Sequence, residues 1–232
     1  MRRIIDVRLP APLDRELDQL HQLEITSEGI IRQILPMATG DLTAGESWNG
    51  DWLSPRGIDL QINGGLGLAF PELKPSDLPR LIDLLDQLWA DGVEAIAPTL
   101  VTCGIAPLRQ ALSVLQEARR HEQAGRCRLL GAHLEGPFLA NERRGAHPPE
   151  HLAVPSLEAL DERIGGFETE IALMTLAPEL PGASAVIARL RELGIMVALG
   201  HSAAKADQAA VGFDQGVGIL THAFNAMPGL HH

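Results

Sequence analysis

Three residues far apart in this chain have the types and settings of a hydrolytic metal site. Glu135 lies in His-Leu-Glu-Gly-Pro-Phe-Leu, His201 in Leu-Gly-His-Ser-Ala-Ala and His222 in Thr-His-Ala-Phe-Asn-Ala-Met, and each follows a short apolar run. One carboxylate and two imidazoles can hold a catalytic zinc ion that keeps one position open for water. Because such a metal lowers the pKa of water toward neutrality, this set predicts a hydrolase.

Two amide residues suggest how many metal ions such a site would hold. Gln61 and Asn63 stand at the end of the strand-like run 57–62 and, two residues apart, would project to one side of a strand. Neutral amides are poor ligands for a transition metal beside imidazole and carboxylate, so we expect one metal ion rather than two. Either the two amides line the rim of the pocket or they cap the end of the strand.

The surroundings of Glu135 leave a second interpretation open. A lone buried carboxylate is costly unless it is paired or bound to a metal. The alternative to a metal ligand is therefore an ion pair with Arg143 or Arg144. His133 shares a strand face with Glu135, and we interpret it as a buried supporting histidine rather than a ligand.

Two further segments could contact a substrate. The proline-rich loop 143–151 carries His147, a candidate donor to a carbonyl or hydroxyl oxygen, and His151, which we expect to serve the loop itself. Asn225 and Ala226 lie just beyond His222, and their amide groups could hold a phosphate or an amide oxygen. A role for Asn225 in forming the turn is the alternative.

From residue 56 onward, strand-like and helix-like segments alternate. The strands are short and apolar throughout, as expected for parallel strands covered on both faces. The first helix would begin with Ser76 as its N-cap. The predicted strands are 57–62, 95–100, 128–133, 171–176, 195–199 and 218–221, and the predicted helices are 76–88, 106–122, 156–164, 183–193 and 203–214.

This alternation predicts an α/β fold. A closed (β/α)8 barrel or an open doubly wound sheet would both fit it. No glycine fingerprint follows the first strand, which argues against a dinucleotide-binding fold. The candidate polar residues instead follow several different strands, as in barrel active sites. We therefore predict an incomplete (β/α)8 barrel, because about six of its eight strands are present.

Residues 1–55 have a different character from residues 56–232. Residues 23–26 and 30–35 flank Ser-Glu-Gly and predict a β-hairpin with Gly29 at the turn. We predict two domains: a small β module over 1–55, which would be the N-terminal part of a β-sandwich, and a truncated hydrolase barrel over 56–232.

Composition limits the classes of partner. With 30 acidic and 19 basic residues, the formal net charge is −11, so the chain lacks the basic surface of a nucleic-acid binder. No run of about 18 apolar residues is present to span a membrane, and the first residues lack the apolar core of a signal peptide. Cys103 and Cys127 cannot form a disulfide framework. We expect a soluble cytoplasmic protein with a small-molecule substrate.

Five motifs in order resemble those of the N-acetylglucosamine-6-phosphate deacetylases of the amidohydrolase superfamily. The resemblance covers residue 56 to the end, with a weaker likeness in the N-terminal hairpin. The motifs are Gly-Ile-Asp-Leu-Gln-Ile-Asn-Gly at 57–64, His-Leu-Glu-Gly-Pro-Phe at 133–138, Gly-Ala-His-Pro-Pro-Glu-His at 145–151, Gly-His-Ser at 200–202 and Thr-His-Ala-Phe-Asn-Ala-Met at 221–227.

The resemblance implies metal-dependent hydrolysis of the acetamide of N-acetylglucosamine 6-phosphate to glucosamine 6-phosphate and acetate. It assigns the metal to Glu135, His201 and His222, with zinc as the expected ion. Substrate contacts fall on Ala146, His147, Asn225 and Ala226. Gln61 and Asn63 match the members of the family that keep a single metal ion.

The resemblance also places part of the machinery outside this chain. The general acid/base of the family is an aspartate after a later strand, which would lie beyond His232. We therefore expect a fragment of an enzyme that forms a homodimer when complete, and no catalytic acid/base within the chain itself.

Two alternatives to this assignment stay open. One is another amidohydrolase, acting on a cyclic amide or on a different N-acetyl sugar phosphate. The other is a non-catalytic remnant that binds a metal or a partner.

Overall fold

A computed structural model describes residues 1–10, 19–37 and 44–229 of the chain. His231 and His232 lie outside the described residues. The chain divides into two compact units, Met1–Arg56 and Gly57–His232. The boundary predicted from sequence between residues 55 and 56 lies one residue before the observed division. No helix within the described ranges is long and apolar enough to cross a membrane.

The N-terminal unit is built on a small sheet with the strand order β3-β2-β1-β4. The predicted hairpin is confirmed as the antiparallel pair β2 and β3, and Gly29 turns the chain with a φ of 82°. The sequence analysis missed β1, the strand that pairs with both β2 and β4. The four strands are β1 (Arg2–Arg8), β2 (Leu20–Ile25), β3 (Ile31–Pro36) and β4 (Glu46–Ser47).

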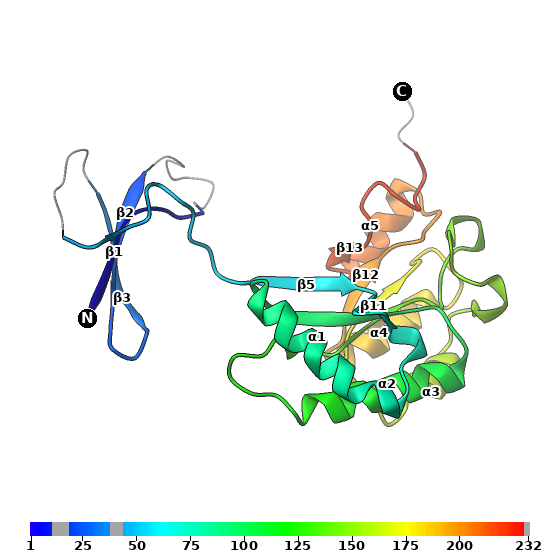
Figure 1. Cartoon of the computed structure of the whole chain (residues 1–232). Coiled ribbons are helices and arrows are strands. Elements are labelled where there is room, and N and C mark those ends of the chain that lie inside the picture. Colours follow the sequence, from blue (N-terminus) through cyan, green and yellow to red (C-terminus); the bar gives the residue numbers. More distant parts are fainter. Residues whose placement is uncertain (11–18, 38–43, 230–232) are drawn as a thin grey trace. The chain divides into compact units, whose positions relative to one another are not determined.

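The C-terminal unit is a curled parallel sheet in which strands alternate with helices (Figure 1). Its strand order is β13-β12-β11-β10-β8-β5, with β9 also paired to β8. The strands are β5 (Gly57–Ile62), β8 (Val93–Val101), β9 (Arg128–Leu129), β10 (Ala132–Glu135), β11 (Ile171–Leu176), β12 (Met196–Leu199) and β13 (Ile219–Leu220). A short antiparallel pair, β6 (Gly64–Gly65) and β7 (Leu68–Ala69), follows β5.

Five α-helices follow the strands along this sheet, from α1 after β5 to α5 after β12 (Figure 1). They are α1 (Leu78–Ala90), α2 (Ile105–Arg119), α3 (Leu157–Ile164), α4 (Ala183–Glu192) and α5 (Ala206–Asp214). The apolar faces of α1 to α4 and of the central strands form one core, in which Leu81, Leu112, Leu134, Ile187 and Val197 are buried. Parallel strands in consecutive order with helical crossovers confirm the predicted incomplete (β/α)8 barrel.

Two boundaries differ from the sequence prediction. Ser76 does not cap α1: residues Pro75–Asp77 form a 3-10 turn, in which the Asp77 carboxylate accepts the Lys74 backbone N–H at 2.9 Å. The predicted strand 128–133 is instead two strands, β9 and β10, interrupted at Gly131, whose φ is 122°. β10 ends at Glu135, two residues beyond the predicted end of the strand.

Candidate metal centre

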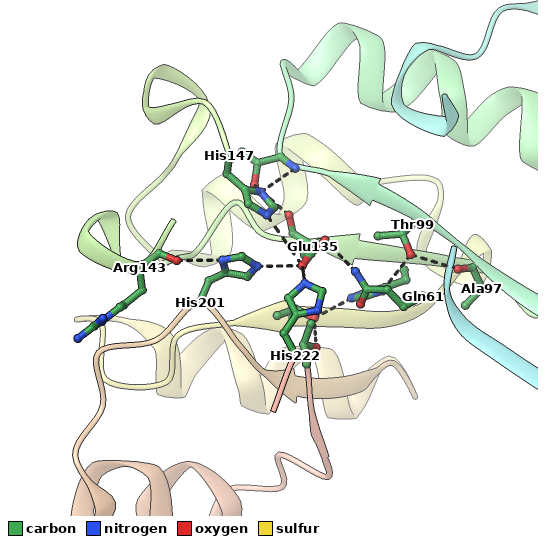
Figure 2. Close-up of polar contacts among 12 residues, drawn as sticks. Gln61, Ala97, Thr99, Glu135, Arg143, His147, His201 and His222 are labelled. Atoms are coloured by element: carbon green, nitrogen blue, oxygen red, sulfur yellow. Dashed lines mark hydrogen bonds and ion pairs between the residues drawn. The ribbon is translucent and has the colours of Figure 1, made fainter. Parts of the chain in front are cut away.

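Glu135 is the last residue of β10 and lies at the centre of a cluster of polar side chains (Figure 2). Its side chain is 3% exposed. One oxygen, Oε1, accepts hydrogen bonds from His201 Nε2 at 2.9 Å and from His222 Nε2 at 2.7 Å. The other, Oε2, accepts one from Gln61 Nε2 at 3.0 Å. The structure therefore brings together three carboxyl-end residues and one amide that the sequence had singled out.

The charge of Glu135 is stabilised by these neighbours. Burial raises the pKa of its carboxyl, but the hydrogen bond from His201 and the nearby imidazoles outweigh burial and lower the pKa to about 2. The alternative of an ion pair with an arginine is wrong, because Arg143 contributes only its backbone carbonyl to the site and its side chain points away from Glu135 (Figure 2).

His201 is fixed on both sides of its ring. It follows β12 after Gly200, where an added Cβ would lie 2.7 Å from Thr175 and 2.8 Å from Thr221, so only glycine fits. His201 Nδ1 donates to Arg143 O at 2.9 Å while Nε2 faces Glu135. Burial opposes the charge on this ring, but the hydrogen bonds to Glu135 and Arg143 outweigh it and raise its pKa.

His222 follows β13 and Thr221 and is the exposed member of the cluster. Its side chain is 38% exposed, against 7% for His201. The two rings meet edge to face with centroids 5.3 Å apart. Asn225 N–H closes a turn onto His222 O at 2.6 Å, which is the turn-forming role weighed for Asn225 from the sequence.

His147 reaches the same carboxylate from the loop after β10. Its Nε2 lies 3.9 Å from Glu135 Oε1, and its ring meets that of His201 with centroids 4.5 Å apart. Burial is the main cause that lowers the pKa of His147, to about 4, so the ring is neutral near pH 7. Thr102, which the sequence analysis did not single out, holds this ring through its backbone N–H and its hydroxyl, at 3.3 and 2.9 Å from Nδ1.

A second polar layer lies beneath the cluster. His133 is fully buried, with Nδ1 3.3 Å from Thr99 Oγ1 and Nε2 2.7 Å from Thr175 Oγ1, whose hydroxyl is 2.8 Å from Thr221 Oγ1. Burial lowers the pKa of His133 to about 4. This confirms His133 as a supporting histidine and leaves it without a place among the metal ligands.

The remaining candidates lie farther from the carboxylate. Ala146 and Asn225 are exposed, and Ala226 is half-buried on the segment that follows His222. Asn63 is exposed and accepts the Phe70 N–H through its backbone carbonyl at 3.0 Å, so its contact serves the turn after β5. Gln61 alone of the two amides faces the cluster.

The residues suit a divalent metal by chemistry and by spacing. Glu135, His147 and His201 each place one possible ligand atom within 4.8 Å of the others. His222 Nε2 is nearer to Glu135 Oε1 than either of the other two rings. A carboxylate and imidazoles at this separation are the ligand types of a one-metal zinc site. The structure thus offers three histidines for two imidazole positions.

Comparison with known proteins identifies relatives that match most of the chain. N-acetylglucosamine-6-phosphate deacetylase of Caenorhabditis elegans is 38% identical over 188 residues, which cover 78% of this chain and 44% of that protein. N-acetylgalactosamine-6-phosphate deacetylase of Escherichia coli is 35% identical over 214 residues, which cover 91% of this chain and 54% of that protein. The chain is thus similar to a part of each of these deacetylases.

Solved structures agree with the sequence relatives. N-acetyl-D-glucosamine-6-phosphate deacetylase from Mycobacterium smegmatis, a mutant in complex with N-acetyl-D-glucosamine-6-phosphate, superposes with a TM-score of 0.77 at 28% identity. That match covers 100% of this chain and 57% of the solved one. No family model matches the chain. The chain spans about half the length of the curated deacetylases it matches.

Proposed function

We propose that this chain carries the metal site of an N-acetylhexosamine-6-phosphate deacetylase, with Glu135, His201 and His222 holding one divalent ion, zinc. The observation that carries the proposal is the meeting of His201 Nε2 and His222 Nε2 on one carboxylate oxygen, at 2.9 and 2.7 Å. The three residues follow or end β10, β12 and β13 of one parallel sheet, and Glu135 and His222 are 87 positions apart. They converge as residues of hydrolytic sites do at the strand ends of a barrel.

Hydrogen bonding and distance support His201 and His222 as the imidazole ligands. A backbone carbonyl only accepts, so Arg143 O keeps a proton on His201 Nδ1 and leaves Nε2 for a metal. His222 Nε2 lies 2.7 Å from Glu135 Oε1, whereas His147 Nε2 lies 3.9 Å from that oxygen. His147 would then serve the substrate rather than the metal.

A bound zinc ion would polarise the acetyl carbonyl and lower the pKa of water. His147 would help to hold the acetyl carbonyl or the sugar. The Gln61 side chain would keep its 3.0 Å hydrogen bond to Glu135 Oε2 and so fix the orientation of the carboxylate. Because Gln61 is a neutral donor in this contact, it leaves no second metal position, in line with a one-metal site.

Substrate contacts beyond the acetyl group are assigned to Ala146, Asn225 and Ala226. Ala146 precedes His147 in the loop after β10, and the 225–226 pair follows His222. Ser202 N–H donates to Ala226 O at 3.2 Å, which ties this segment to the residue next to His201. A sugar phosphate held between these two segments would place its acetamide near Glu135.

Proton transfer requires a group that the described residues do not place at the site. Among residues 1–10, 19–37 and 44–229, no aspartate joins the group of possible ligands around Glu135. We assign the general acid/base to an aspartate after a later strand of the complete enzyme. We also propose that the complete enzyme is a cytoplasmic homodimer. Loss of such a proton shuttle typically costs about 10²–10⁴ in rate.

The sugar has two candidates. The relative that covers more of this chain, at 91%, is named for N-acetylgalactosamine 6-phosphate, whereas the relative with the higher identity, at 38%, is named for N-acetylglucosamine 6-phosphate. The two substrates differ in the configuration of one hydroxyl, which a site distinguishes by hydrogen bonds rather than by the metal.

A chimaera tests the proposal in a complete enzyme. Residues 57–229 would replace the matching part of the Caenorhabditis elegans deacetylase, and acetate release would be measured on both sugar phosphates and on unphosphorylated N-acetylglucosamine. We expect release that depends on zinc and on the phosphate, and that Glu135→Gln abolishes. A folded chimaera that binds zinc and releases no acetate from either sugar phosphate would contradict the deacetylase function and support a non-catalytic metal-binding role.

A further inference from the structure

Glu179, three residues beyond the end of β11, contacts the loop that carries His201. Both of its carboxylate oxygens are used: the Ser202 hydroxyl donates to Oε2 at 2.7 Å and the Ala203 backbone N–H donates to Oε1 at 2.6 Å. Ser202 is 1% exposed and Glu179 is half-buried. Hydrogen bonds to an ionised acceptor are stronger than those between neutral groups, so Glu179 holds this turn firmly.

The turn that Glu179 holds follows a residue in an unfavourable backbone conformation. His201 has a φ of 51°, in the left-handed region that residues with a Cβ seldom adopt. Such a conformation persists where surrounding contacts over-determine it. The two residues directly after His201 supply both groups that Glu179 binds, so the carboxylate fixes the chain on the C-terminal side of the left-handed residue.

Other contacts to this turn come from the backbone. Ala140 N–H donates to His201 O at 2.9 Å, and Ser202 N–H donates to Ala226 O at 3.2 Å. The Ser202 hydroxyl also accepts the Ala204 N–H at 3.0 Å. Glu179 is therefore a side chain through which the conformation of His201 can be altered without touching the proposed ligands.

We propose that Glu179 is a positioning residue for the metal centre, which sets the direction of the His201 ring by fixing the Ser202–Ala203 turn. The inference rests on the proposed metal site, because it needs His201 as a ligand. Glu179 has no hydrogen bond to Glu135 among the described residues, so its effect on the site would pass through the backbone on either side of Ser202. Outer residues that orient a ligand typically change metal affinity by about 10–100-fold.

The test is zinc affinity by competition titration of the full chain, with folding checked by circular dichroism. We expect Glu179→Ala to raise the zinc Kd by about 10–100-fold and to change the visible spectrum of the cobalt-loaded protein at saturation. Glu179→Gln keeps one acceptor oxygen and should give a smaller loss. Ser156→Ala, which removes the cap of α3 at Ala159 N, is the control: it should lower stability and leave the zinc Kd unchanged.

Two comparisons separate the possible failures. If His201→Ala abolishes zinc binding but both Glu179 variants bind zinc like the unmodified protein, the role of Glu179 is overturned and the metal site stands. If His201→Ala itself binds zinc normally, the proposed site is wrong. Glu179→Ala combined with Ser202→Ala should cost less affinity than the sum of the two single changes, because both remove the contact between Glu179 and Ser202. Full additivity would contradict the route through Ser202.

Discussion

His201 and His222 bind the same carboxylate oxygen but lie in very different surroundings. His201 follows β12, a strand with a neighbour on each side, and its side chain is 7% exposed with both ring nitrogens bonded. His222 follows β13, the last strand of the described sheet, and is 38% exposed. One side of the site is therefore fixed by packing within this chain, and the other lies at the edge of the sheet.

The edge around His222 is also apolar. Phe213, Leu220 and Phe224 are 41%, 47% and 84% exposed, and together with Met227 they line a groove of about 620 Å³ between α5 and the segment after β13. Soluble proteins seldom leave a large apolar surface exposed beside an edge strand such as β13. Two imidazoles with the same ligand chemistry can therefore differ in how firmly the chain holds them. His201 is held by the residues that surround it, whereas His222 is exposed at the edge of the sheet.

Removing the shared carboxylate should have the largest effect, because it acts on both sides at once. We expect Glu135→Gln to weaken zinc binding by more than the roughly 10–100-fold that follows loss of an outer-shell partner. Competition titration measures the affinity. Gln61→Ala, which removes only the donor to Oε2, is the matched comparison and should cost less. Equal losses in the two variants would show that the carboxylate is not itself a ligand.

The second-largest effect should be a loss of folding stability at acid pH, caused by the buried residue His133. His133 has a folded pKa of about 4, below its ordinary value of 6.5, so folding favours the neutral ring. Stability from this residue is present above pH 6.5 and is lost as the pH falls toward 4, by on the order of 3 kcal/mol. Glu135 loses its own contribution in a lower window, from pH 4.5 toward 2.

Urea unfolding between pH 7.5 and 4.5 measures this effect. His133→Asn keeps a polar group facing Thr99 and Thr175 but cannot titrate. The variant should therefore lose less stability across this range than the unmodified protein. Parallel pH profiles for the two proteins would show that His133 does not titrate as its burial requires.

The two ligand histidines should differ in what they contribute to folding. His201→Ala should lower the free energy of unfolding of the metal-free chain by about 1–3 kcal/mol, because Arg143 O loses a buried donor. His222→Ala should change it by no more than about 0.5 kcal/mol, as expected at an exposed position. Urea denaturation with a metal chelator present compares them. If His222→Ala lowered the free energy of unfolding more than His201→Ala, the packed side of the site would not be the one that supports folding.

The apolar edge itself should contribute least to stability. Phe224→Ser should leave the free energy of unfolding within about 0.5 kcal/mol, because the side chain is 84% exposed. It should reduce self-association, measured by light scattering against protein concentration. Leu112→Ala, a fully buried position in α2, is the contrasting control and should cost about 2–5 kcal/mol. A comparable cost for Phe224→Ser would place that ring in a packed environment.

Periodic apolar patterns made the barrel half of the fold predictable. Leu81 and Leu85 on α1, or Ile171 and Leu173 on β11, repeat at the spacing of their element. The end of β10 was not predictable, because the break at Gly131 depends on its approach to Ala172 N, 2.9 Å from where a Cβ would be. Strand β1 was missed because its alternation is disturbed at Asp6, which has a φ of 54° within a register shift.

The site was predictable in its ligand types and not in its supports. Glu135, His201 and His222 stand out because charged or titratable residues directly follow apolar runs. Thr102 and Glu179 act through contacts with residues 45 and 23 to 24 positions away, respectively. A single threonine or glutamate in a loop has no local pattern that indicates such a partner. The tautomer of His201 likewise depends on Arg143 O, a backbone group that only the folded chain brings near.

The most direct test of the account is the zinc stoichiometry and affinity of four single variants beside the unmodified chain. We predict one zinc ion per chain, with tight binding lost in Glu135→Gln, His201→Ala and His222→Ala and kept in His147→Ala. Retention of full affinity in His222→Ala, with loss in His147→Ala, would contradict the assignment and place the ion on Glu135, His147 and His201 instead.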